Sequence, residues 1–213
     1  MKKILQKAAL VVGLSMVASA SFASPNTCDA ASNLVANCGF QTGDFTNWAV
    51  SGNDVPGEQD NLYGVEQGAD PFDGISPNSG NYQAFFADLT ANATTISQTL
   101  STQAGDTYLI SFFLAQDTAP GTGEGSNSLD VMFGGTTLTN QNNVGVQGYS
   151  EYSFLANATS GSTTLSLTLG NGLGEFLLDD VSVSVPEPST AAGVGIGLLA
   201  IMFATRRQRA GKD

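Results

Sequence analysis

The sequence lacks basic side chains over almost its whole length. All seven Lys and Arg residues lie in the two terminal segments, at positions 2, 3, 7, 206, 207, 209 and 212, and the chain has no His. Residues 8–205 nevertheless carry 18 of the 19 acidic residues, all except Asp213. Such a body repels phosphate and has no cation to hold it, which excludes binding of nucleic acids and nucleotides. Without His, a Ser-His-Asp triad and a His-ligated zinc site are excluded as well.

The unpaired carboxylates leave two interpretations open. A dense acidic surface keeps a protein soluble and needs no further role. Carboxylate oxygens also attract hard cations such as Ca²⁺. One structural Ca²⁺ is compatible with both interpretations.

The first 23 residues have the layout of a secretory signal peptide. Three lysines precede an apolar run over 8–18, and the small residues up to Ala23 fit the cleavage rule. We therefore expect residues 1–23 to be removed on export and residues 24–185 to fold in an oxidising compartment.

Only two cysteines, Cys28 and Cys38, occur in the chain. An isolated pair in an exported protein is expected to form a disulfide. Closing so short a loop stabilises a fold by about 2–3 kcal/mol in the chain-entropy model.

The C-terminal segment has three parts. It begins with Pro186, Glu187 and Pro188, continues with an apolar run over 191–205, and ends in a basic cluster that contains Arg206, Arg207 and Arg209. As a helix the apolar run is about 22 Å long, short of the roughly 30 Å of a hydrocarbon core. We expect a marginal transmembrane helix with its basic end in the cytoplasm.

This layout, VPEPST followed by a short apolar helix and RRQR, resembles the PEP-CTERM sorting signal of Gram-negative bacteria over residues 186–210. The resemblance implies a transient anchor in the inner membrane, processing by the membrane protease-transpeptidase exosortase, and a final place at the cell surface or outside the cell. Prolines hold the segment before the helix extended, which leaves it accessible to a protease.

The residues between the predicted signal peptide and the C-terminal segment have the pattern of β-strands separated by turns rich in Gly, Asn and Ser. Alternation is clearest at Leu165, Leu167 and Leu169, which share one face of their strand. Strand-like segments occur at 82–89, 94–100, 107–115, 128–133, 136–138, 149–156, 162–169 and 175–185. Eight or more such strands predict one all-β domain, an antiparallel two-sheet β-sandwich.

The order of several stretches, among them NLVANCGFQTGDFTNW, TTISQTLSTQAGDTYLISFFLA and GEFLLDDVSVS, resembles jelly-roll domains related to carbohydrate-binding modules. The resemblance covers 33–185. It implies one structural Ca²⁺ where the first and last strands meet, with candidate ligands Gln41, Asp44 and Asp180. Such domains usually have an acidic residue at the position of Gln41. The carboxylate of Asp44 is the candidate to supply the charge that is missing there. Alternatively, Asp179 and Asp180 are surface residues at a strand end.

Exposed aromatic side chains are the usual platforms for sugar rings, while neighbouring polar groups satisfy the sugar hydroxyls. Candidate glycan contacts are Trp48, Tyr63 and Tyr82, and further aromatic candidates are Tyr149 and Tyr152. Trp48 also suits a core position. Tyr63 lies in the acidic segment 53–78, which is either a functional loop or a solvated insertion.

These features predict a non-catalytic, exported surface or extracellular-matrix protein that associates with extracellular polysaccharide. Its expected partners are exosortase, the inner membrane and that polysaccharide. The alternative is a glycoside-active enzyme that uses paired carboxylates, although no acidic residue lies in a recognisable catalytic motif. A matrix component without a defined ligand also remains open.

Overall fold

The computed structural model describes residues 27–52, 63–71, 74–87, 93–117, 127–171 and 174–186. These ranges form one short 3-10 turn, η1 (Thr27–Asp29), and ten β-strands. No helix within them is long and apolar enough to cross a membrane. The predicted signal peptide and the predicted sorting helix with its arginines lie outside the described residues.

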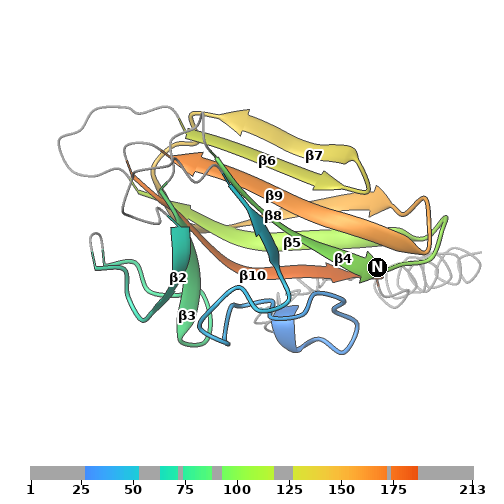
Figure 1. Ribbon diagram of the computed structural model, residues 1–213, viewed down its shortest axis with the longest axis horizontal. Coiled ribbons are helices and arrows are strands. Elements are labelled where there is room, and N and C mark those ends of the chain that lie inside the picture. The colour runs from blue at the N-terminus through green and yellow to red at the C-terminus, as the bar shows by residue number, and fades with distance from the viewer. Residues whose placement is uncertain are drawn as a thin grey trace, which may run out of the picture.

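The strands form two antiparallel sheets of five, as the predicted β-sandwich requires (Figure 1). The first sheet has the order β1 (Ala49–Ser51), β4 (Thr94–Ser101), β9 (Ser162–Asn171), β6 (Asn127–Phe133), β7 (Thr136–Asn142). The second sheet has the order β2 (Tyr63–Gln67), β3 (Tyr82–Phe86), β10 (Phe176–Ser184), β5 (Thr107–Gln116), β8 (Gln147–Asn157). The all-β prediction is confirmed.

The core lies between the two sheets and follows the period-two pattern of the sequence. Leu165, Leu167 and Leu169 of β9 are fully buried, as their alternation predicted. Ile110, Phe112 and other inward side chains of the second sheet belong to the same core cluster. One hydrophobic core therefore joins both sheets.

The last strand, β10, is the central strand of its sheet and is buried along almost its whole length. At its beginning it pairs with β3 and β5. Further along, the N-terminal segment, blue in Figure 1, lies beside it: Leu34 N donates to Val183 O at 2.8 Å, and Val181 N donates to Cys38 O at 3.0 Å. The two ends of the domain thus meet at β10.

The eight predicted strands correspond to β3–β10, whereas β1 and β2 were not predicted. β2 lies inside the acidic segment that the sequence indicated as a loop, and it pairs with β3 along its full length. Gly64 weakens the sequence pattern that would predict a strand here, because glycine is depleted in strands. A Cβ at Gly64 would lie 2.7 Å from the Phe85 ring, so the close packing of this pair requires glycine.

Candidate functional site

Two consecutive acidic residues, Asp179 and Asp180, lie in the middle of β10, where a β-bulge shifts the pairing register with β5. Asp179 pairs with Phe113 and Ser182 pairs with Ser111, so β10 has one residue more than β5 in this interval. Asp180 takes a left-handed conformation, with φ of 51°. Neighbouring side chains of a regular strand point to opposite faces, but the bulge lets both acids reach Ser79.

Both carboxylates are buried, with 0% of Asp179 and 2% of Asp180 exposed. The alternative that these acids lie on the surface is therefore wrong. Each of their four oxygens accepts a hydrogen bond. Asp179 accepts from the backbone N of Asp180 at 2.8 Å and of Ser79 at 2.9 Å. Asp180 accepts from Ser79 Oγ at 2.6 Å and from Asn78 Nδ2 at 2.7 Å.

Burial raises the pKa of Asp179 to about 7, and the neighbouring charge of Asp180 adds to the rise. Hydrogen bonds from the backbone N–H groups of Ser79, Asp180 and Asn78 oppose it. The side chain therefore titrates near neutral pH, well above an ordinary aspartate.

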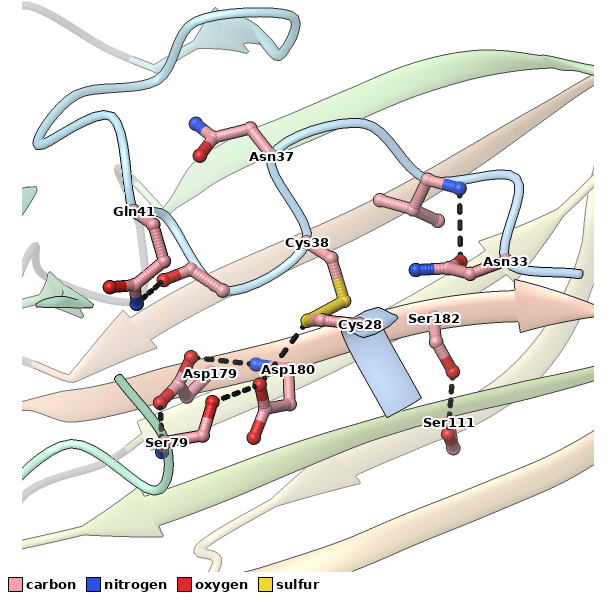
Figure 2. Close-up of a disulfide and its surroundings, with 12 residues drawn as sticks. Cys28, Asn33, Asn37, Cys38, Gln41, Ser79, Ser111, Asp179, Asp180 and Ser182 are labelled. Atoms are coloured by element: carbon pink, nitrogen blue, oxygen red, sulfur yellow. Dashed lines mark hydrogen bonds between the residues drawn. A yellow bond between two sulfur atoms is a disulfide. The ribbon is translucent and has the colours of Figure 1, made fainter. Parts of the chain in front are cut away.

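The predicted disulfide between Cys28 and Cys38 is present and lies against this acid pair (Figure 2). Cys28 Sγ is 3.2 Å from Asp180 Oδ1. A disulfide sulfur has no proton to donate, so this is an S···O contact. A Cβ at Gly39 would lie 3.2 Å and 3.3 Å from oxygens of Asp179 and Asp180, so glycine lets the N-terminal segment approach the acids closely.

The three predicted calcium ligands each take part in hydrogen bonds. The Gln41 amide donates to Gly39 O at 2.6 Å and accepts from Asn81 N at 2.9 Å, closing two loops onto each other. The exposed Asp44 carboxylate accepts from Thr46 N and Thr42 Oγ1 in its own turn, and bonds to Thr46 and Thr42 lower its pKa.

Asp180, the third predicted ligand, accepts hydrogen bonds from the side chains of Ser79 and Asn78. Among the described residues, Cys28, Cys38 and Asp180 form the one group of three potential ligands within 4.8 Å. Two of these are disulfide sulfurs and not thiolates. Binding of Ca²⁺ by Gln41, Asp44 and Asp180 stays a prediction.

The outer face of the second sheet, which points away from the core, is a surface distinct from the junction of Asp179, Asp180 and the disulfide. Tyr152, Phe154 and Ala156 of β8 face the core, so Tyr149 and Leu155 point outward. Tyr149 OH donates to Gln83 Oε1 of β3 at 2.8 Å, across β5 and β10. In a flat sheet these strands would be about 14 Å apart. The two side chains therefore reach toward each other over β10 and β5 on this face.

A band of apolar and polar side chains follows β5 and β8 on this outer face, and we call it the outer band. Phe113 pairs with Glu151, and Leu109 pairs with Leu155. Leu155 is 66% exposed, Phe113 and Leu109 are partly exposed, and Glu151 is exposed. The outer band consists of Leu109, Phe113, Tyr149, Glu151, Ser153 and Leu155.

The predicted glycan contacts take different positions. Trp48 is only 7% exposed, stacks on Phe40 with ring centroids 6.0 Å apart, and donates from Nε1 to Asn37 O at 3.3 Å. As a core residue it is unavailable as a sugar platform, which corrects that prediction. Tyr152 also faces the core, stacked on Phe112 at 5.1 Å.

Tyr63 and Tyr82 are partly exposed at the end of the sandwich where β2 and β3 lie. The Tyr63 ring packs 6.2 Å from that of Phe45. A Cβ at Gly43 would lie 3.1 Å from the Tyr82 ring, so this tyrosine covers the Gly43 turn. Neither belongs to the outer band, and their role in glycan binding stays a prediction. Tyr149 is the aromatic candidate that the fold places on the outer face of the second sheet.

Residues 184–208 match the PEP-CTERM protein-sorting motif. The match covers the Pro-Glu-Pro, the apolar run and two of the three predicted arginines, Arg206 and Arg207. The motif implies export, a transient membrane anchor and processing by exosortase. No curated protein matches the chain.

Solved structures share the sandwich fold. The chain is similar to TmCBM61, a carbohydrate-binding module in complex with β-1,4-galactotriose, with 19% identity and a TM-score of 0.53, over 72% of this chain and 99% of that one. It is also similar to the enzymatically active domain of tailspike protein 4 of bacteriophage CBA120, with 14% identity and a TM-score of 0.51, over 73% of this chain and 22% of that one. The chain thus carries a PEP-CTERM sorting motif behind a β-sandwich with the fold of carbohydrate-binding modules.

Proposed function

We propose that this chain is a non-catalytic surface or matrix protein that binds extracellular polysaccharide through the outer band. The observation that carries the proposal is the mixed apolar and polar surface of the outer band, in which Leu155 is 66% exposed. The sorting motif supports the extracellular setting in which such a ligand occurs.

The outer band has the chemistry that sugars require. Leu155 and Phe113 offer apolar surface for the C–H faces of pyranose rings, and Ser153 and Glu151 offer groups for their hydroxyls. Residues 8–205 have no basic side chain, so an anionic polysaccharide would be repelled. The substrate class we propose is therefore a neutral polysaccharide.

For the tails, we propose that residues 1–23 are removed on export and that exosortase acts at 186–210. The helix of that segment holds the protein in the inner membrane until processing. The β-sandwich domain, residues 24–185, then remains outside the cell as the domain that binds polysaccharide. Because proline favours an extended backbone, the Pro-Glu-Pro sequence is expected to be accessible to a protease.

The experiment compares two exposed aliphatic residues of equal exposure. Leu155, in the outer band, and Val146, outside it, are each 66% exposed. We expect Leu155→Asn to weaken retention on a neutral polysaccharide in affinity electrophoresis by about tenfold, the equivalent of about 1.4 kcal/mol, while Val146→Asn leaves it unchanged. Equal retention of both variants would exclude the outer band as the binding face. Release of new reducing ends from the polysaccharide would instead support the glycoside-active alternative.

A further inference from the structure

The edge of the first sheet at β7 lacks the features that usually keep a sheet edge from pairing with another strand. Among the described residues, β7 pairs with β6 alone and ends the sheet (Figure 1). None of its residues, Thr136–Asn142, is charged or a proline, and all are at least partly exposed. Natural edges are protected by charge, proline or short length. The other edge strands have such protection, because β1 has three residues, β2 contains Glu66 and β8 contains Glu151.

The hydrogen bonds to β6 determine which backbone groups of β7 point away from the sheet. Asn143 N donates to Asn127 O at 3.0 Å, and the register before this bond is regular as far as a β-bulge near the start of β7. In an antiparallel pair, alternate residues bond to the partner strand. Gln141 therefore bonds to β6, whereas the N–H and C=O groups of Asn140 and Asn142 point to the free edge.

This part of the edge is held in place by a buried side chain at its end. Asn127 Nδ2 donates to Val144 O at 2.9 Å, and Asn127 Oδ1 accepts from Val144 N at 2.7 Å. Only 3% of Asn127 is exposed. An edge that is already ordered loses little conformational entropy when another strand pairs with it.

The distribution of charge indicates which partner fits this edge. Residues 8–205 carry 18 acidic and no basic side chains, so two copies of the chain repel each other over most of their surface. Residues 131–150, which contain β7, include no acidic residue. Asp130 of β6 lies opposite Asn140, one strand inward. If two β7 edges pair, the two Asp130 residues are three strand spacings apart, about 14 Å, which exceeds the roughly 8 Å Debye length at physiological salt.

We propose that β7 is the interaction surface for a second copy of this chain. Two β7 strands pair antiparallel about a two-fold axis, and the free backbone groups of Asn140 and Asn142 bond to the partner strand. Such an edge is self-complementary, because each copy offers the same donors and acceptors. The amide side chains of the strand also both donate and accept, so they pair without charge. The first sheets of the two copies then form one continuous sheet.

The first test is sedimentation velocity of the mature secreted protein over a series of concentrations. We expect a reversible equilibrium between monomer and dimer. The dimer should be tighter at an ionic strength of about 1 M than at about 0.15 M, because the shorter Debye length screens the remaining carboxylates. A monomer at every concentration and at both ionic strengths would overturn the proposal.

Amide hydrogen exchange locates the interface. The N–H groups of Asn140 and Asn142 should exchange rapidly in dilute protein and slowly in concentrated protein, whereas that of Gln141, bonded to β6, should be protected in both. Protection that increases with concentration in β8 and not in β7 would contradict the assignment.

A pair of matched variants completes the test. Asn142→Asp changes the shape of the side chain little but places like charges on adjacent strands of the dimer. We expect it to weaken dimerisation by about tenfold, the equivalent of about 1.4 kcal/mol, with partial recovery at high ionic strength. Asn157→Asp, at an exposed position of β8, is the control and should dimerise as the wild type does. Thermal midpoints close to that of the wild type verify that both variants are folded.

Wild-type dimerisation by Asn142→Asp, or loss of the dimer in Asn157→Asp alone, would place the interface elsewhere and overturn the proposal. The measurements need no polysaccharide, so this inference and the proposed function fail independently.

Discussion

The hydroxyl of Ser79 donates a 2.6 Å hydrogen bond to Oδ1 of Asp180, a residue 101 positions further along the chain. The same serine donates its backbone N–H to Asp179 Oδ2 at 2.9 Å. The connection from β2 to β3 is thereby fastened to the last strand. Because Cys28 also contacts Asp180, three distant segments meet at one buried carboxylate.

Removing the hydroxyl group of Ser79 is expected to destabilise the domain. Ser79→Ala leaves Asp180 Oδ1 without its shortest hydrogen bond, and a buried acceptor that loses its donor costs about 1–3 kcal/mol. Urea unfolding followed by Trp48 fluorescence measures the change. Ser153→Ala, an exposed serine of β8, is the matched control and should stay within about 0.5 kcal/mol of wild type. Equal stability of the two variants would contradict the role given to Ser79.

Reduction of the disulfide should lower stability by about 2–3 kcal/mol, the loop-closure contribution of a short loop. The chain contains no other cysteine, so a reducing agent acts on this bond alone. A Cys28→Ser/Cys38→Ser double variant should show the same lower urea midpoint and no further response to the reductant. An unchanged midpoint after reduction would mean that the hydrogen bonds to β10 suffice to hold the N-terminal segment.

Stability should fall as the pH rises. The native protein keeps protons on Asp179 up to about pH 7 and on Glu175 up to about pH 9, whereas ordinary values are 3.8 and 4.5. The folded state therefore binds more protons than the unfolded state over these intervals, and the free energy of unfolding decreases with pH.

We expect a higher thermal midpoint at pH 5 than at pH 8.5. Glu175→Gln should flatten the part of the profile between pH 7 and pH 9, because it removes the group that titrates there. A wild-type midpoint that rises from pH 5 to pH 8.5 would show that other groups dominate the dependence.

Much of the sandwich was predictable because its strands carry local signals. Alternating leucines identified β9, and the strand-like segment 175–185 corresponds to β10. β2 escaped prediction because Gly64 interrupts its pattern, and its strand character depends on pairing with β3.

The sites were less predictable, because they depend on contacts between distant segments. The burial of Asp179 and Asp180 requires a bulge and a serine 100 positions away from Asp179. Trp48 looked like a possible platform, and only the fold shows its ring stacked on Phe40. Glu175 and Asp117 meet where β10 begins and β5 ends, and no short motif connects them.

Processing of the tail is tested by the mass of the released protein. If exosortase acts within 186–210, intact-mass spectrometry of protein shed from cells should show a chain that lacks Arg206, Arg207 and Arg209. Replacing Pro186 and Pro188 by Ala should leave the unprocessed chain in the membrane fraction. Released protein that still contains the arginine cluster would contradict processing by this route.

The most direct test of the central claim is a binding isotherm of the mature secreted protein on polysaccharides. We predict saturable binding to at least one neutral polysaccharide, and much weaker binding to an acidic polysaccharide of similar length. Absence of saturable binding to a broad panel of neutral polysaccharides, by protein whose thermal unfolding shows it to be folded, would contradict the account.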